Sequence, residues 1–336
     1  MAPSVSTTLW DTTGNAITAA LAAERRQAGA IGAGQALTLV IVAAEDQVSA
    51  AERAATAAAE AHPSRLLIVV RRQPDTPNRL DAEVAIGGRL GPAEAVVMRM
   101  YGRLALHAES VVLPLLAPDA PVVTWWHGPP PDEIAADPLG ILAGRRVTDC
   151  SLADDPIAAL HQRAADYARG DTDLAWTRIT PWRALLAGAF DAFDGVAGTV
   201  TSVRVTAEAG NPSAALLRGW LSARLGVDAE CVDDGGPGIT SAEIRVEPPS
   251  GAERVVAVHR PDGRSAVLSV SGELDHQLPL PRRQLGALLT EELRRLDPDL
   301  VYGEALAAAT GMDHRDLEAR PSERRHIWRD PMQATG

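Results

Sequence analysis

Short apolar runs and longer amphipathic stretches alternate along the first half of the chain. The runs LTLVIV (37–42) and RLLIVVR (65–71) are typical of strands buried on both faces. The Ala-rich stretch between them reads as a helix, which predicts a β-α-β unit with a parallel strand pair. Further strands are predicted at 81–86, 94–101, 109–115 and 121–126, and helices at 15–28, 46–61, 138–146 and 156–168.

The second half has shorter strands separated by Gly and Pro turns. An amphipathic helix is predicted at 212–225, after a strand at 199–207. Strands then follow at 227–233, 240–247, 253–260, 264–270 and 274–280, and helices at 282–296 and 299–309. We therefore expect an α/β domain with a mostly parallel sheet over residues 1–194. We expect an α+β domain with an antiparallel sheet over 195–310, and a mobile tail over 311–336.

Composition and charge exclude several classes of function. The 336 residues carry a net charge of −12, which argues against nucleic acid or an anionic membrane surface as a partner. Every basic residue is Arg, so the chain has no Lys for a Walker-A loop or a Schiff base. No apolar run is long enough for a membrane helix, and the N-terminus does not read as a signal peptide. Cys150 and Cys231 fall in different predicted domains, so we expect no disulfide and a cytoplasmic protein.

Known catalytic and cofactor motifs are not found. The cluster Gly29, Gly32 and Gly34 precedes a predicted strand, whereas a dinucleotide site needs the glycines after it. We therefore expect no nucleotide cofactor. His107 and Glu109 alternate on a predicted strand and could face the same way, but two ligands without a third make weak evidence for a metal. We expect no metal site, and a structural or solvated His107.

The placement of tryptophan is the unusual feature of this sequence. Of seven Trp residues, four fall between positions 125 and 182. Trp125 and Trp126 end a predicted strand and point to opposite faces, so one can join the core while the other faces a Pro-rich loop or solvent. Thr180-Pro181 predicts the start of a new helix, with a single kinked helix as the alternative.

Aspartate and arginine side chains accompany these tryptophans. In the segment 170–193, Asp171 and Asp173 are placed to cap a helix, and Trp176 and Trp182 flank Arg178, with Arg183 directly after. If the helix is continuous, Arg178 and Trp182 could form a cation–π contact. One interpretation is a set of core tryptophans beside a capped helix. The other is an interface, because Trp and Arg are enriched in binding hot spots.

The apolar runs and the Trp-rich segment belong to a longer ordered series of motifs. In chain order these are LTLVIV, HPSRLLIVV, LDAEV, HAESVVLPLLAPDAPVVTWWHG, RRVTD, GDTDLAWTRITPWRALLA, PSAALLRGWLSARL and LPRRQLGALLTEELRRLDPDLVYGEAL. Together they resemble the actinobacterial glucose-6-phosphate dehydrogenase assembly protein family, OpcA, over about residues 10–309. The resemblance implies a non-catalytic partner that binds the dehydrogenase and favours its active oligomer, in support of the oxidative pentose phosphate pathway.

With that resemblance, the tryptophan and arginine residues become candidate partner contacts. These are Trp125, Trp126, Asp171, Asp173, Trp176, Arg178, Trp182 and Arg183. Two alternatives stay open: an α/β enzyme of an unfamiliar type, and a sensor of a sugar phosphate or nucleotide. For the sensor, His107, Arg178 and Arg183 are the candidate phosphate contacts, since Arg binds phosphate through two parallel hydrogen bonds. Cyanobacterial relatives link activation to redox state, but the spacing of Cys150 and Cys231 gives that no support here.

Overall fold

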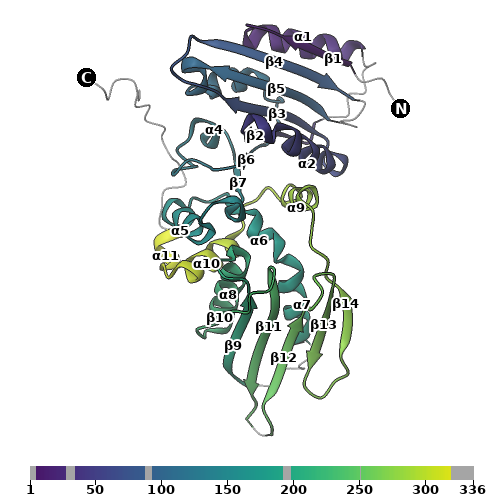
Figure 1. Cartoon of the computed structure of the whole chain (residues 1–336), viewed down its shortest axis with the longest axis vertical. Coiled ribbons are helices and arrows are strands. Elements are labelled where there is room, and N and C mark those ends of the chain that lie inside the picture. Colours follow the sequence, from purple (N-terminus) through teal and green to yellow (C-terminus); the bar gives the residue numbers. More distant parts are fainter. Residues whose placement is uncertain (1–4, 28–34, 88–92, 192–197, 250, 319–336) are drawn as a thin grey trace, which may run out of the picture. The chain divides into compact units, whose positions relative to one another are not determined.

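The structure, a computed structural model, describes residues 5–27, 35–87, 93–191, 198–249 and 251–318 (Figure 1). These form two compact units. Unit 1 comprises Met1–Thr148 and Leu293–Asp297, and unit 2 comprises Asp149–Glu292 and Pro298–Arg320. The expected boundary after residue 194 lies outside the described residues. The compact units divide earlier, after Thr148, because the Trp- and Arg-rich segment packs in the core of unit 2.

Unit 1 is built on a mixed sheet whose central strands are parallel. Its strands are β1 (Val5–Leu9), β2 (Leu37–Ala43), β3 (Ser64–Arg71), β4 (Arg79–Ile86), β5 (Glu94–Tyr101), β6 (Val122–His127) and β7 (Arg145–Thr148). They are ordered β1-β4-β5-β3-β2-β6-β7. The run from β5 to β7 is parallel, and β4 and β1 add an antiparallel edge. The expected α/β class with a mostly parallel sheet is therefore confirmed.

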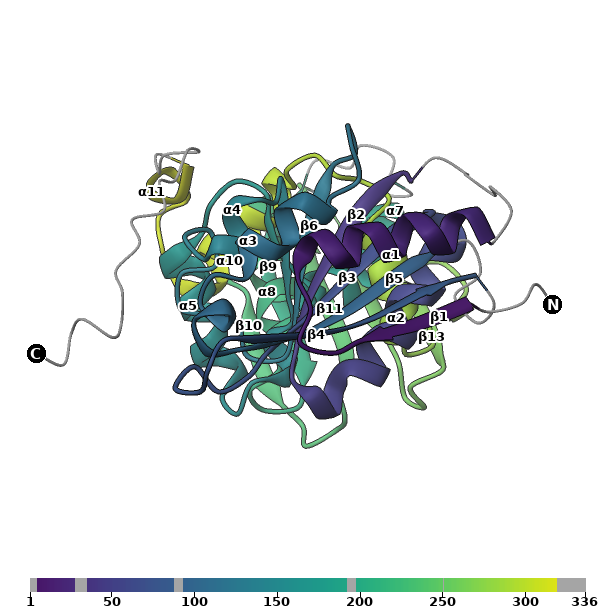
Figure 2. The same cartoon turned by 90° about the horizontal axis from the view of Figure 1, so that it is seen from above.

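Helices cover both faces of the central strands of unit 1. The helices are α1 (Gly14–Gln27), α2 (Val48–Ala61), α3 (Ala108–Val112) and α4 (Pro138–Ile141). Ile17 and Leu21 of α1 pack with Leu67 and Val69 of β3, whereas Ile68 points to the other face, where α2 contacts β2 and β3. Figures 1 and 2 show α1 beside β1 and β4. Burial on both faces explains why these strands are continuously apolar.

Two predicted elements of unit 1 are wrong. The stretch 109–115 is not a strand: it is the helix α3 followed by a 3-10 turn, because Val111 and Val112 reach the core from a helix and Pro114 lies in the first turn of the 3-10 segment. The helix expected over 138–146 ends at Ile141, and β7 begins at Arg145. The edge strand β1 was not predicted.

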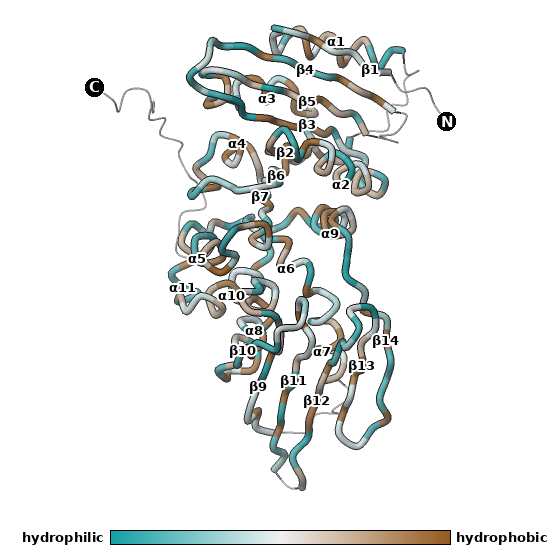
Figure 3. The backbone as a smooth tube through the Cα atoms, in the orientation of Figure 1, coloured by the Kyte–Doolittle hydropathy of each residue, from teal (hydrophilic) through white to brown (hydrophobic). Residues whose placement is uncertain are grey.

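Unit 2 combines a mostly antiparallel sheet with helices. Its sheet contains β9 (Thr199–Ala207), β10 (Glu230–Asp233), β11 (Ile239–Glu247), β12 (Arg254–His259), β13 (Ser265–Val270) and β14 (His276–Pro279), in the order β10-β9-β11-β12-β13-β14. Only the β10–β9 pair among these described strands is parallel. Buried and accessible residues alternate along β11, and Figure 3 shows hydrophobic and hydrophilic stretches changing along β11 and β12. This alternation is typical of a sheet with one covered face.

The helices of unit 2 fill the covered side of that sheet. They are α5 (Pro156–Asp166), α6 (Leu174–Arg178), α7 (Thr180–Asp191), α8 (Pro212–Leu225), α9 (Leu285–Glu292), α10 (Leu300–Thr310) and α11 (His314–Glu318), with a short strand β8 (Asp171–Asp173) before α6. Helix α8 packs against β9 and α10, and α7 packs against β12. The mobile tail expected from residue 311 is wrong for its first part, because α11 buries Leu317 in the core. Residues 319–336 lie outside the described residues.

Candidate functional site

Two short helices carry the Trp- and Arg-rich segment. Helix α6 ends at Arg178 and α7 begins at Thr180, so the predicted helix start at Thr180-Pro181 is confirmed over the alternative of one kinked helix. Asp173 caps α6 through a hydrogen bond from the Ala175 N–H at 2.8 Å, and it also accepts one from Cys150 N–H at 2.9 Å. The Asp173 carboxylate therefore holds two chain segments together.

All four tryptophans of the predicted contact surface are buried. Trp125 and Trp126 are 0% and 1% exposed, so neither faces solvent. The expectation that one of them faces the Pro-rich loop agrees with Trp126, because a Cβ built at Gly140 would lie 3.4 Å from the Trp126 ring and against the Ile134 carbonyl of that loop. Successive side chains of a strand point to opposite faces, so the burial of both Trp125 and Trp126 shows that both faces of β6 are covered. Trp176 and Trp182 are 1% and 2% exposed, and Trp176 Nε1–H donates to Asp299 Oδ2 at 2.8 Å. Trp176 and Trp182 thus belong to the hydrophobic core of unit 2.

The two arginines of this segment have partners within unit 2. Arg178 donates to both Asp149 carboxylate oxygens, at 2.7 and 2.5 Å. Burial lowers the pKa of Arg178, but hydrogen bonding to Asp149 and its charge outweigh this and raise that pKa overall. Arg183 lies over the Trp176 ring, 3.6 Å from its centroid. The helix break and the Asp149 ion pair thus replace the expected Arg178–Trp182 contact.

His107 lies in unit 1, whereas Arg178 and Arg183 belong to unit 2. His107 occupies the N-cap position of α3, and its Nδ1 lies 3.4 Å from Glu109 Oε1. The predicted proximity of His107 and Glu109 is therefore confirmed, although they lie on a helix and not on a strand. Within the described ranges, no group of three or more His, Cys, Asp or Glu side chains could hold a metal ion.

Both cysteines lie in unit 2, not in different domains as we expected. Cys150 is buried and Cys231 is exposed, and both are free thiols. Burial, followed by the charge and hydrogen bond of Asp173, raises the pKa of Cys150 well above its ordinary value. A raised pKa lowers the thiolate fraction, so Cys150 has the character of an inert core thiol.

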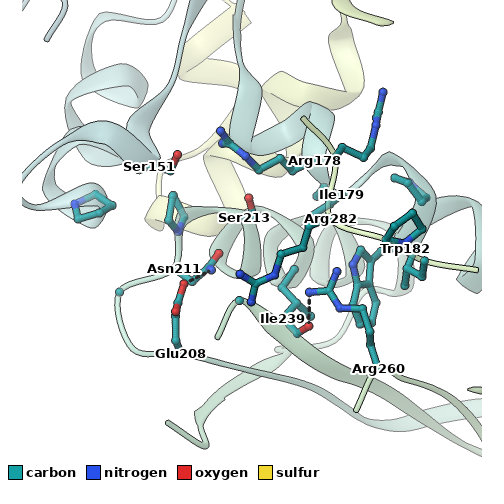
Figure 4. Close-up of a pocket in the computed structure, with 18 of the residues that line it drawn as sticks. Ser151, Arg178, Ile179, Trp182, Glu208, Asn211, Ser213, Ile239, Arg260 and Arg282 are labelled. Carbon is teal, nitrogen blue, oxygen red and sulfur yellow. Dashed lines mark hydrogen bonds between the residues drawn. The ribbon is translucent and has the colours of Figure 1, made fainter. Parts of the chain in front are cut away.

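A cavity of about 420 Å³ opens beside the α6–α7 junction (Figure 4). Its wall comes from this junction, the N-terminus of α8, the ends of β11 and β12, and the loop before α9. Four of its lining residues are arginines, Arg178, Arg260, Arg282 and Arg283, against one acidic residue, Glu208. In a chain with a net charge of −12, this is a local excess of positive charge.

Sequence reasoning missed Arg260 and Arg282. Arg260 directly follows β12, donates from Nη2 to the Ile239 carbonyl oxygen at 2.7 Å, and lies 5.2 Å from the Trp182 ring centroid. Arg282 lies between β14 and α9 and donates to the Pro237 carbonyl oxygen at 2.8 Å. The available signal was arginine directly beside two turn-forming prolines, before Pro261 in HRPDGR and after Pro281 in LPRRQ.

No helix in the described part of the chain combines the length and apolarity needed to cross a membrane. Among the described residues of unit 1, Trp10 is a large aromatic side chain exposed at the surface, with arginine and tyrosine nearby. Trp10 is 68% exposed, and the Arg79 guanidinium lies 6.0 Å from its ring and 5.5 Å from the Tyr101 ring. Arg72 approaches the same Tyr101 ring at 5.9 Å. We call these four residues the Trp10 surface.

Comparison with solved structures gives only distant similarity. One example is KijD10, a 3-ketoreductase from Actinomadura kijaniata in complex with NADP and TDP-benzene, at 14% identity and a TM-score of 0.43. The similar region covers 84% of this chain and 96% of that protein.

Comparison with protein families and curated proteins is more specific. Residues 55–165 match the N-terminal domain and residues 169–306 the C-terminal domain of the OpcA-type glucose-6-phosphate dehydrogenase subunit. The "Putative OxPP cycle protein OpcA" of Synechococcus elongatus is 32% identical over 139 residues, which are 40% of this chain and 31% of that protein. Its Synechocystis counterpart is 31% identical over 121 residues, or 34% and 26% of the two chains. This chain thus matches about a third or less of the length of these curated relatives. Because the two domain matches together span most of its residues, the chain belongs to the OpcA glucose-6-phosphate dehydrogenase assembly family.

Proposed function

We propose that this protein binds glucose-6-phosphate dehydrogenase and favours its active oligomer, without catalysing a reaction of its own. The observation that carries the proposal is the pair of domain matches, one in each half of the chain, to families named for a subunit of that dehydrogenase. The curated relatives are named for the OxPP cycle, which agrees with a role in the oxidative pentose phosphate pathway.

The required energy is small. An activator that binds the active oligomer about tenfold more tightly than the inactive form needs only ~1.4 kcal/mol of differential binding free energy. A single well-placed aromatic contact supplies that amount, because truncating a hot-spot residue typically costs about 2 kcal/mol or more. A modest surface on this chain is therefore sufficient for activation.

The proposal places the accessible dehydrogenase contact on the Trp10 surface. Trp125, Trp126, Trp176 and Trp182 are buried, so a partner would reach them only after the core opened. Trp10 instead exposes 68% of its area and lies beside Arg79, which in turn lies near Tyr101; Trp, Tyr and Arg are the residue types enriched in binding hot spots. The buried tryptophans then support folding and not the contact.

The test is titration of this protein into dilute dehydrogenase while NADPH formation is recorded. Wild type should raise the rate saturably, and Trp10→Ala should need at least tenfold more protein for the same effect. Leu274→Ala is the matched control, because Leu274 is also apolar and is 85% exposed, but belongs to unit 2. Equal activation by wild type and Trp10→Ala would show that the dehydrogenase contact lies outside the Trp10 surface. No activation by wild type would refute the proposed function.

A metabolite sensor is the second candidate function. The observation that favours it is the arginine-lined cavity of unit 2. An activator and a sensor are compatible, because a bound ligand can alter how a protein engages its partner. An α/β enzyme is the remaining alternative, and it requires turnover of a metabolite by this protein without the dehydrogenase.

A further inference from the structure

Two arginines of the cavity converge on one point without a carboxylate between them. An alanine Cβ built at Gly238 would lie 3.4 Å from Arg260 Nη2 and 3.8 Å from Arg282 Nη2. Burial, and next the nearby charge of Arg282, lowers the pKa of Arg260. Like charges this close repel one another, so their convergence calls for an anion.

The Arg260 guanidinium has unused hydrogen-bonding capacity in a buried position. Its residue is 9% exposed, and its Nε–H has no hydrogen-bond partner. Across the described ranges, no carboxylate lies within ion-pair distance of Arg260 or Arg282. The nearby Asp262 is occupied by its own turn, where it accepts hydrogen bonds from the backbone of Arg264 and Ser265. Burying a guanidinium group that has no ion pair and an Nε–H without a hydrogen-bond partner costs folding free energy, and a bound anion would offset that cost.

The other two arginines of the cavity wall show the contrast. Arg178 is paired with Asp149, and Arg283 lies 2.5 Å from Glu291 Oε2. Their charges are compensated by the protein itself. Within the described ranges, Arg260 and Arg282 are thus the two cavity arginines without an ion pair, although the more distant charge of Asp262 acts on Arg260.

The polar side chains elsewhere in the cavity wall suit a ligand that carries hydroxyl groups. Ser151, Asn211 and Ser213 line it, and Glu208 accepts a hydrogen bond from Asn211 Nδ2 at 2.9 Å. Figure 4 shows the Arg282 side chain extending between this polar wall and Arg260 beside Trp182. The volume of about 420 Å³ lies in the range of small-molecule sites.

We propose that this cavity binds a small phosphorylated metabolite, with its phosphate held between Arg260 and Arg282 and its hydroxyl groups facing Asn211 and Ser213. A phosphate monoester fits better than a carboxylate, because it brings up to two negative charges and three acceptor oxygens to two separate guanidinium groups. This site differs from the one expected at His107, Arg178 and Arg183: Arg178 is paired with Asp149, Arg183 stacks on Trp176 and does not line the cavity, and His107 lies in unit 1.

The test measures ligand binding by the full chain alone, by calorimetry at constant ionic strength. The probes are glucose 6-phosphate, inorganic phosphate and glucose. Glucose 6-phosphate should bind saturably, phosphate should compete with it, and glucose should not bind. Arg282→Ala should weaken binding at least tenfold, the loss expected for one charge-assisted interaction.

Control variants separate a site from general charge and from misfolding. Arg204→Ala removes the same charge from an exposed position of β9 outside the cavity, and it should bind like wild type. Arg260→Lys keeps the charge but loses the planar guanidinium group, so it should bind glucose 6-phosphate several-fold more weakly. Its circular dichroism spectrum should show that it remains folded.

Three outcomes would overturn the site. They are no saturable binding of either phosphate probe by wild type at millimolar concentration, equal losses in Arg204→Ala and Arg282→Ala, and glucose binding as well as glucose 6-phosphate. If Arg282→Ala binds glucose 6-phosphate like wild type in the calorimetry but activates less in the dehydrogenase titration, the cavity takes a carboxylate of the partner and the ligand proposal fails. Because the calorimetry contains no dehydrogenase, its failure leaves the proposed function intact.

Discussion

Replacement of Trp176 by alanine separates a core role from a contact role for the Trp-rich segment. Trp176 is 1% exposed, lies 6.0 Å from the Tyr302 ring, and donates to Asp299, which itself caps α10 through the Tyr302 N–H. Trp-to-Ala substitutions in a core cost about 3–5 kcal/mol of unfolding free energy. For a unit of this size, each kcal/mol lowers Tm by roughly 2–4 °C, so Tm should fall by about 6–20 °C.

The matched variant is Trp10→Ala, the same substitution at a position that is 68% exposed. It loses only an exposed contact with Arg79, which is worth at most about 1 kcal/mol. Thermal unfolding of both variants should be followed by far-UV circular dichroism. Similar Tm values for the two variants, or a Trp176→Ala protein as stable as wild type, would refute the assignment of Trp176 to the core.

Two further predictions concern close packing and pH. Gly219→Ala should lower the free energy of unfolding by about 1–3 kcal/mol, because the added Cβ would clash with the Ala305 carbonyl oxygen. Gly188→Ala in α7 is the control: its Cβ would meet nothing within 4 Å, so the substitution should be neutral or stabilising by about 0.5–1 kcal/mol. Urea unfolding of both variants measures the difference. Hydrogen bonds from the Ser265 and Arg264 N–H groups lower the pKa of Asp262 to about 2, so its contribution to stability is complete above pH 3.8 and is lost as the pH falls through about 2. An NMR titration that gave the Asp262 carboxyl a pKa near its ordinary value of 3.8 would contradict the hydrogen bonding in this turn.

Sequence patterning predicts well those strands whose two faces are both buried. The strands Leu37–Ala43 and Ser64–Arg71 carry central apolar runs and are buried along almost their whole length, because both of their faces are covered. The stretch 109–115 was misread because the β-branched pair Val111 and Val112 has high strand propensity, whereas tertiary packing favours a helix there. Local pattern carries no information about such long-range packing.

The candidate site was predictable only in part. Sequence pattern placed the α6–α7 junction correctly, but the ion pair between Arg178 and Asp149 joins positions that the pattern does not connect. Arg260 and Arg282 come from separate turns, and only the folded sheet brings them together at Gly238. The burial of both Trp125 and Trp126 depends on cover over both faces of β6, which the pattern of that strand alone did not reveal.

The most direct test of the central claim is a mass measurement of dilute glucose-6-phosphate dehydrogenase with and without this protein, made alongside its rate of NADPH formation. The account predicts a complex containing both proteins, a shift in the dehydrogenase toward its active oligomer, and a saturable rise in rate. The absence of a complex at excess protein, with an unchanged rate, would contradict it.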